Sequence, residues 1–319
     1  DLAGGQKDLG HDPIVAMPQE PGAAFQFSRS DISSIQLGNP RFMSFLAALR
    51  QAQPDILHCH DGTVARWARY APFRPPALVT LHIRYKPRSM SHFDGVHVLA
   101  DWQAAGLKDF KGKVAQIGNW VPDIAAADSV SIMAARRRAG AGERDFLVVF
   151  LGRLERVKGV DLLIDAIRSL TDKDIKVAIV GVGKDEAEIR ERAKGEPRIM
   201  FAGYSNRPAE WYGAADLVAM PSRAEPFALV ALEAMAFGAP IVASGVDGFA
   251  EIFRDRKDAL VPSEDPAALA PAIARCKAAK TDPGPMRTRY DMSRFQRSSG
   301  IAAVTRFYDE IVPLKRLRA

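Results

Sequence analysis

The chain has 319 residues, of which 47% are hydrophobic and 26% are charged, and its formal net charge at pH 7 is +6. This length suits about two domains with separate cores, and the lack of an apolar run of ~20 residues argues against an integral membrane protein. Two cysteines, Cys59 and Cys276, are too few for a disulfide framework and are not spaced as zinc ligands. Composition therefore predicts a cytoplasmic, modestly basic protein with anionic substrates, or one that lies on an anionic membrane surface.

The first half of the chain alternates short apolar runs with amphipathic stretches, which predicts a parallel α/β domain. A helix is expected over residues 1–10, and because a parallel sheet rarely begins with its helix, we expect a strand and its glycine loop to precede it. A loop at residues 118–122 contains Gly and Pro and is the candidate hinge. Strands are expected at residues 13–17, 55–60, 78–81, 96–100 and 114–117.

The second half repeats this pattern with stronger signals. Helical spacing of apolar residues is found over 161–170, and a charged helix is expected over 185–193. Strands apolar on both faces belong in a parallel sheet covered by helices, which predicts a doubly wound domain. Two such halves would place a ligand in the cleft between them. The strands are expected at residues 146–151, 176–180, 199–202, 217–220 and 241–244.

The strongest signal for chemistry follows the strand at 217–220. A helix is expected to begin near Pro226 and to stop at Gly238. Its residues are apolar nearly all round, which predicts a buried helix and makes the carboxylate of Glu233 costly unless it is hydrogen-bonded. The amides at its start suit a phosphate, with Glu225 at the mouth of that site. These amides belong to Phe227, Ala228 and Leu229.

An anion site beside two carboxylates that can accept hydroxyl hydrogen bonds is what a nucleotide sugar requires. The alternative interpretation is structural. In that case Glu225 is only a charge at a helix start, and Glu233 pairs with a buried arginine.

These residues carry a resemblance to a known family. Glu225 and Glu233 form a Glu-x7-Glu pair, and the segment 221–244 closely resembles the signature of family-4 retaining glycosyltransferases with the GT-B fold. Upstream, the segment from Gly152 to Gly159 resembles that family's Gly-Arg-Leu-x-x-x-Lys-Gly loop. The resemblance covers roughly residues 146–262, and the first half matches only loosely.

The resemblance implies an α/β GT-B fold, in which two Rossmann-like domains face each other across a donor/acceptor cleft. Residues 1–120 would form the acceptor-binding domain, completed by a C-terminal helix within 302–319. Residues 121–301 would form the domain that binds the nucleotide sugar.

The resemblance also implies roles for individual residues. Arg153 and Lys158, in the loop that opens with Gly152, would hold the donor diphosphate and stabilise its growing charge without a metal. Glu233 would accept hydrogen bonds from the ribose hydroxyls, and Glu225 from a hydroxyl of the transferred sugar. The amides of Phe227, Ala228 and Leu229 would contact phosphate and sugar, and the base would rest near Tyr204 and Ser205.

Histidines mark the ends of two strands in the first half. The strand at 78–81 resembles the family's strand that ends in a histidine, so His82 would face the donor sugar or position the acceptor when the domains close. A capped or solvated histidine is the open alternative. His58 and His60 alternate across a strand, which predicts that one of them packs in the core.

Other motifs are weaker. Asp172-Lys-Asp174 is interpreted as a solvated turn rather than a metal motif, and Gly181-Val-Gly183 lacks the further residues of a dinucleotide site. The segment 66–74, with cations nearby at 84–88, mixes arginines and aromatic residues. It suits either an anionic membrane or lipid-linked acceptor, or a solvated helix with its aromatic side packed inward. The chain ends in a predicted helix, 302–311, followed by Lys315, Arg316 and Arg318.

The sequence thus predicts a metal-independent retaining glycosyltransferase that needs no cofactor and takes a UDP- or GDP-sugar as substrate. A front-face displacement, in which the leaving phosphate helps to take the acceptor proton, is what the family implies. The expected acceptor is a saccharide or lipid in lipopolysaccharide, exopolysaccharide or glycolipid assembly. The expected location is the cytoplasm or the inner face of the cytoplasmic membrane, without a nucleic-acid partner. Alternatives are a nucleotide-sugar epimerase, a phosphorylase of related fold, and a non-catalytic scaffold that binds sugar nucleotides.

Overall fold

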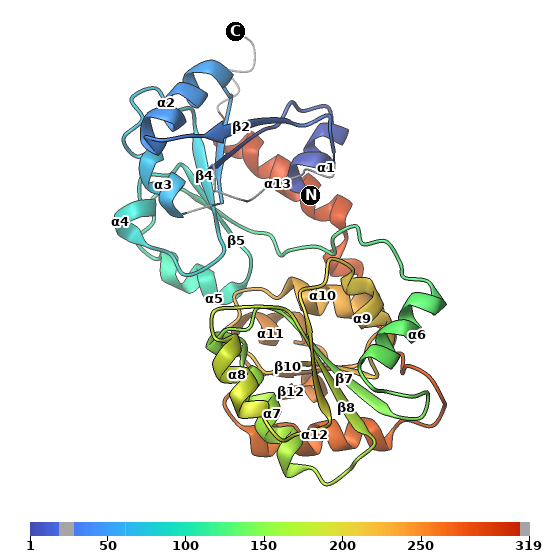
Figure 1. The fold of residues 1–319 in the computed structure, drawn as a ribbon. Coiled ribbons are helices and arrows are strands. Elements are labelled where there is room, and N and C mark those ends of the chain that lie inside the picture. Colours follow the sequence, from blue (N-terminus) through green and yellow to red (C-terminus); the bar gives the residue numbers. More distant parts are fainter. Residues whose placement is uncertain (19–28, 61, 313–319) are drawn as a thin grey trace. The chain divides into compact units, whose positions relative to one another are not determined.

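The computed structural model describes residues 1–18, 29–60 and 62–312. The chain divides into two compact units (Figure 1). The first unit comprises Asp1–Asn119 and Gln296–Ala319, and the second comprises Trp120–Phe295. The division falls within the loop at 118–122.

The first unit contains two parallel sheets. The larger sheet has the strand order β3 (Leu57–Cys59), β4 (Ala77–Leu81), β5 (Gly95–Val98) and β6 (Lys113–Gln116). A separate pair consists of β1 (Ile14–Pro18) and β2 (Ser33–Leu37). The helices are α1 (Leu2–Asp8), α2 (Arg41–Ala52), α3 (Gly62–Ala68), α4 (Pro87–Met90), α5 (Asp101–Ala104) and α13 (Arg297–Ile311).

Strand β4 is covered on both of its faces. Val79 and Leu81 belong to one core cluster, whereas Leu78 packs with Phe307 and Ile311 of α13, as the alternation of side chains along a strand requires. Helix α13 packs closely against two glycines, because a Cβ on Gly95 would overlap the side chain of Ile311 and a Cβ on Gly5 of α1 would overlap that of Ile301. The C-terminal helix is therefore built into the first unit, and it begins at Arg297, earlier than the predicted residue 302.

The second unit is one six-stranded parallel sheet with helices on both faces (Figure 1). Its strand order is β12 (Leu260–Val261), β11 (Ile241–Ser244), β10 (Leu217–Met220), β7 (Phe146–Leu151), β8 (Ile175–Val180) and β9 (Ile199–Gly203). The helices are α6 (Ser129–Arg138), α7 (Val160–Ser169), α8 (Glu186–Ala193), α9 (Pro208–Ala214), α10 (Leu229–Ala236), α11 (Asp247–Ile252) and α12 (Pro266–Ala278). Helices α7, α8 and α12 share one core cluster with β7 and β8, and α9 packs against β7 and α6.

The predicted strands all form, within two residues of the predicted bounds, and the helix predicted over 1–10 is α1. Two predictions about α10 are wrong. The helix begins at Leu229 rather than near Pro226, and it is not apolar and buried all round, because Leu229 is 44% exposed. The helix has an open side at its first turn, where the chain enters from the loop after β10.

Candidate functional site

Loops that follow β7, β8 and β10 lie directly against one another at one edge of the sheet in the second unit. Gly181 has a φ of +141°, and a Cβ at this position would overlap the carbonyl oxygen of Gly152. Gly159 has a φ of +69°, and a Cβ there would overlap the carbonyl oxygen of Pro221. Since only glycine allows both the left-handed backbone and this approach, these glycines hold the loops in backbone contact.

The loop after β7 carries Lys158, and the loop after β10 carries Glu225. Lys158 Nζ lies 2.6 Å from Glu225 Oε2, and both side chains are largely buried. Arg223 locks the two loops together, because its guanidinium makes two hydrogen bonds to Asp161, at 2.8 and 2.7 Å, and its amide donates to the carbonyl of Val157 at 2.8 Å. The structure thus brings two of the predicted site residues into contact.

Arg153 lies in the same loop as Lys158 but has a different environment. Its side chain is 68% exposed, and its Nη1 donates to Glu155 Oε1 at 2.7 Å. Arg153 therefore does not join the Lys158–Glu225 pair. An exposed guanidinium held by one neighbouring carboxylate remains accessible to an anion above the loop.

Glu233 extends from the middle of α10 and accepts a hydrogen bond from the hydroxyl of Tyr212, at 2.5 Å from Oε2. Burial raises the pKa of the Glu233 carboxyl, and the Tyr212 hydrogen bond opposes that rise. The alternative that Glu233 pairs with a buried arginine is wrong for the described residues. Tyr212 lies on α9 and stacks on Phe237 with 5.7 Å between ring centroids. Sequence reasoning missed Tyr212, since nothing in the sequence distinguishes it from a core aromatic.

The first turn of α10 offers backbone donors beside Glu225. The amides of Ala231 and Leu232 donate to the carbonyl of Ala228, which caps the helix without a side-chain hydrogen bond. The amides of residues 227–230 precede these first intrahelical hydrogen bonds of α10. Backbone amides at a helix start and the helix dipole favour an anion here, and this set contains the predicted amides of Phe227, Ala228 and Leu229.

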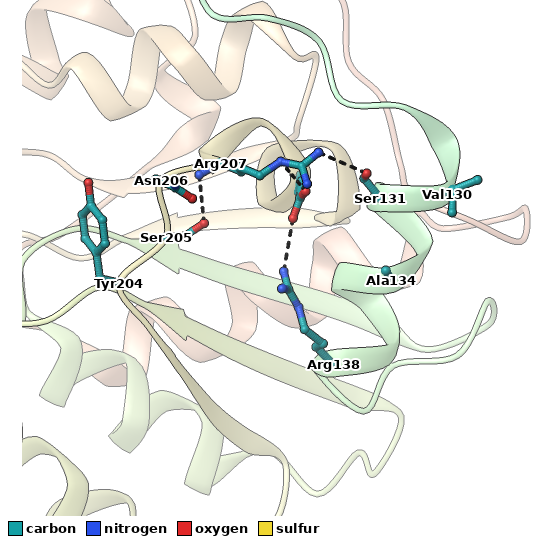
Figure 2. A pocket seen from close by; sticks show the side chains of 9 residues that line it. Val130, Ser131, Ala134, Arg138, Tyr204, Ser205, Asn206 and Arg207 are labelled. Atoms are coloured by element: carbon teal, nitrogen blue, oxygen red, sulfur yellow. Dashed lines mark hydrogen bonds and ion pairs between the residues drawn. The ribbon is translucent and has the colours of Figure 1, made fainter. Parts of the chain in front are cut away.

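Tyr204 and Ser205 lie in the loop after β9, at a pocket of about 350 Å³. Figure 2 shows Tyr204 on one side, apart from a polar cluster on the other. In that cluster, the buried Glu210 carboxylate pairs with Arg207 at 2.8 Å and Arg138 at 3.3 Å. Sequence reasoning missed these three residues, which come from α6, α9 and the loop before α9. Their helices meet only in the folded chain.

His82 lies in the first unit, just after β4. Its Nε2 is 3.2 Å from Nδ1 of His60, which lies just after β3. The prediction that His58 and His60 alternate across a strand is wrong, because residues two positions apart point to the same face of a strand. The two rings accordingly lie 4.1 Å apart between centroids, and His60 directly follows β3. His58 is half-buried and hydrogen-bonded, which agrees with the core role predicted for one of the two.

The aromatic residues of the segment 66–74 differ in burial: one packs inward, as the helix alternative predicts, and two are exposed, as the membrane-surface alternative predicts. Trp67 packs against Phe45 in the core, at 6.0 Å between ring centroids. Tyr70 and Phe73 are exposed, at 65% and 48%. The terminal cations Lys315, Arg316 and Arg318 lie outside the described residues.

The Asp172–Asp174 motif forms a turn before β8, and both carboxylates face Lys277. Among the described residues, no group of three or more His, Cys, Asp or Glu side chains is arranged to hold a metal ion. None of the described helices combines the length and the apolar character needed to cross a membrane.

A comparison with known protein families finds a match within the second unit. Residues 145–278 match the family described as "Glycosyl transferases group 1", so this part of the chain belongs to that glycosyltransferase family, as the sequence motifs predict. The matched segment contains Lys158, Glu225, Tyr212 and Glu233.

Individual relatives support the same assignment. The chain is 32% identical over 244 residues to a phosphatidyl-myo-inositol mannosyltransferase of Mycobacterium leprae, a match that covers 69% of this chain and 63% of the relative. It is 38% identical over 159 residues to a D-inositol 3-phosphate glycosyltransferase of Salinispora tropica, covering 44% of this chain and 33% of the relative. The chain thus spans less than two thirds of these relatives.

Solved structures identify the fold. The sucrose-phosphate synthase of Thermosynechococcus elongatus matches with a TM-score of 0.77 and 21% identity, covering 97% of this chain and 91% of that one. Anabaena HepE in complex with UDP and glucose matches with a TM-score of 0.68 and 19% identity, covering 88% and 83%. The fold is that of GT-B glycosyltransferases, as predicted.

Proposed function

We propose that this protein is a glycosyltransferase that moves a sugar from a nucleoside diphosphate donor to an acceptor hydroxyl. The observation that carries the proposal is the Lys158–Glu225 pair, at 2.6 Å, beside the amides at the start of α10. A cation, backbone donors and a carboxylate converge there, within the segment that matches the family. Such a site suits a diphosphate joined to a hydroxyl-rich sugar.

In the proposed donor complex, Lys158, Arg153 and the amides at the start of α10 hold the diphosphate, above the loop that opens with Gly152. Glu225 accepts a hydrogen bond from the transferred sugar, and Glu233 from the ribose hydroxyls. Tyr212 supports this role, because its hydroxyl uses one oxygen of Glu233 and leaves the other for a ligand. The base rests near Tyr204 and Ser205, at the rim of the 350 Å³ pocket. The donor is a UDP- or GDP-sugar.

We propose retention of the anomeric configuration by front-face displacement, without a metal. The leaving phosphate takes up the acceptor proton, and Lys158 and Arg153 stabilise the charge that develops on it. His82 is the residue of the first unit for which we propose a role toward the sugar or the acceptor.

For the acceptor, we propose a saccharide or a lipid-linked saccharide of the cell envelope, in lipopolysaccharide, exopolysaccharide or glycolipid assembly, reached from the cytoplasmic side. Tyr70 and Phe73 support contact with an anionic membrane surface, because exposed aromatic side chains beside arginines suit such a surface. Arg50 lies over the Phe73 ring at 6.0 Å, which adds a cation to the same patch.

The test is transfer by the full chain from UDP- and GDP-sugars to a panel of envelope saccharides and glycolipids. Release of nucleoside diphosphate that depends on an acceptor, with retained configuration in the NMR spectrum of the product, is the expected result. Conversion of the donor sugar without an acceptor would instead indicate an epimerase. Nucleotide binding without turnover on any acceptor would indicate a scaffold.

A further inference from the structure

Two histidines in the first unit form a pair whose geometry fixes how one of them can act. His60 Nδ1 and His82 Nε2 lie 3.2 Å apart, and the two rings are stacked with centroids 5.5 Å apart. A hydrogen bond between two ring nitrogens needs one proton, so one ring donates and the other accepts. In this arrangement Nε2 of His82 is occupied, and Nδ1 is the nitrogen left for a ligand.

Beneath the pair lies a chain of hydrogen bonds whose direction can be worked out. His97 Nε2 donates to the carbonyl of Ile117 at 2.7 Å, since a carbonyl can only accept. Burial lowers the pKa of His97 to about 4, so the neutral ring accepts at Nδ1 from the hydroxyl of Thr80, at 2.9 Å. The only proton of that hydroxyl is then used, and its oxygen accepts from His58 Nε2 at 2.6 Å.

This series of hydrogen bonds continues to the C-terminal helix α13. Burial also lowers the pKa of His58 well below its ordinary value, so this ring is neutral and its Nδ1 accepts from the hydroxyl of Tyr308 at 2.7 Å. The oxygen of Tyr308 accepts in turn from the side-chain amide of Gln6, at 2.7 Å. With His58 and His97 both neutral, every donor in this series of hydrogen bonds has an acceptor. The hydrogen bonds therefore hold His58 in one tautomer and one orientation.

The fixed ring of His58 supports His60. The two rings are 4.1 Å apart between centroids, and His60 bridges from this support to His82. Desolvation and the neighbouring His82 and His97 lower the pKa of His60 to about 4. The pKa of His82 is lowered by desolvation. Both rings are therefore neutral at pH 7, and each carries one N–H proton, one of which lies in the hydrogen bond between them.

We propose that His60 is a positioning residue, which holds the His82 ring in one orientation so that its Nδ1 faces the reacting sugar or acceptor. The proposal rests on the proposed glycosyltransferase function. His60 acts only through His82, and the Gln6–Tyr308–His58–Thr80–His97 chain acts only through His60. The structure assigns this task to a residue in the loop after β3 that the sequence motifs left without a role.

Two substitutions separate the parts of this arrangement. His60→Phe keeps a ring against His58 but removes the nitrogen that faces His82. His60→Asn removes the ring but keeps a polar atom near the position of Nδ1. His11→Phe, in an exposed segment elsewhere in the first unit, is the control.

Nitrogen-15 NMR of the imidazoles in the full chain reports the tautomer of His82, and steady-state transfer reports kcat and KM. His60→Phe should convert His82 to a mixture of tautomers and lower kcat ~10-fold or more, with KM for the donor changed less than ~3-fold. His60→Asn should restore most of kcat and a single tautomer. His11→Phe should match the parent in both measurements.

An unchanged His82 tautomer and unchanged kcat in His60→Phe would overturn the proposal. Equal loss of kcat in both His60 variants, with the His82 spectrum unaltered, would also overturn it, because that is a structural effect alone. If the unmodified chain transfers no sugar, the proposed function fails, and the NMR spectra still decide whether His60 orients His82.

Discussion

Lys158 and Glu225 are 67 positions apart in the chain, yet their side chains meet at 2.6 Å between Nζ and Oε2. Each shields the other from water, since their side chains are 21% and 10% exposed. A largely buried charge that loses its partner pays a desolvation cost that nothing offsets. Removing either residue therefore leaves the other without its ion-pair partner, so the proposed phosphate contact and the proposed sugar contact are coupled.

This coupling predicts the outcome of single substitutions. Lys158→Met should weaken the binding of UDP or GDP by ~10- to 100-fold, as expected for a lost charge-assisted hydrogen bond. Glu225→Gln should weaken binding of the nucleotide sugar more than that of the free nucleotide. Calorimetry of both variants measures this, with Lys194→Met, an exposed lysine on the α8 side of the domain, as the control. Equal affinities in Lys158→Met and the control would contradict the proposed phosphate contact.

The contact between the loops depends on Gly159. Gly159→Ala combines a positive φ with overlap between its Cβ and the carbonyl of Pro221. We expect it to displace the Lys158 loop, to lower the free energy of unfolding by more than ~1–3 kcal/mol, and to weaken nucleotide binding. Gly195→Ala also has a positive φ, +83°, but no atom lies within 4 Å of its Cβ. Urea unfolding of both variants separates the effect of the overlap from that of the positive φ. Equal losses of unfolding free energy in the two variants would show that backbone strain alone destabilises Gly159→Ala.

Glu233 predicts a pH dependence of stability with a definite sign. Burial raises the pKa of its carboxyl in the folded protein, so the folded state binds more protons than the unfolded chain over the interval between the two values. The free energy of unfolding contributed by this group therefore falls as the pH rises through that interval. Glu233→Gln still accepts from Tyr212 and should be more stable than the parent at pH 7, with a smaller difference near pH 4.

Urea unfolding between pH 4 and pH 8 checks this prediction, with the exposed Glu191→Gln as the matched control. If the advantage of Glu233→Gln were larger at pH 4 than at pH 7, the sign would be wrong, and the carboxylate would be stabilised by contacts other than the Tyr212 hydroxyl.

A buried ion cluster holds α6 and the segment after α12 to the sheet. Asp216 has no exposed side-chain surface and pairs with Arg136 at 2.9 Å and Lys280 at 3.0 Å. Asp216→Asn leaves two buried cations without a counter-charge, which should cost ~3–5 kcal/mol of unfolding free energy. Asp174→Asn, at a mostly exposed carboxylate 3.9 Å from Lys277, should cost less than ~1 kcal/mol. Similar losses in the two variants would refute a special role for the cluster.

How much of the fold the sequence predicts depends on the chemistry of each strand. The runs at 217–220 and 241–244 are apolar on both faces, and β10 and β11 have those bounds. Strand β2, Ser33–Leu37, was not predicted because it has only two apolar side chains, Ile35 and Leu37, and its other three side chains are polar and exposed. Strand β12, Leu260–Val261, is too short for any periodicity.

The candidate site likewise contains residues that the sequence identifies and residues that it does not. Lys158, Glu225 and Glu233 are marked by motif spacing, and the structure joins the first two directly. Their supporting residues leave no such mark. Tyr212 reaches Glu233 from a different helix, and Tyr308 of α13 is linked to Thr80 and His97 through His58. Such partners are set by tertiary packing, which spacing along one segment does not encode.

The most direct test of the donor site is calorimetric binding of UDP, GDP and ADP to the full chain and to Glu233→Ala. We expect one nucleotide to bind clearly more tightly than the others, and the substitution to weaken that binding ~10-fold or more, because a hydrogen bond to a charged, partly buried group is lost. Glu191→Ala, on the exposed face of α8, should leave the affinity unchanged. Failure of a folded chain to bind any nucleotide, or equal affinities in Glu233→Ala and the parent, would contradict the donor site proposed here.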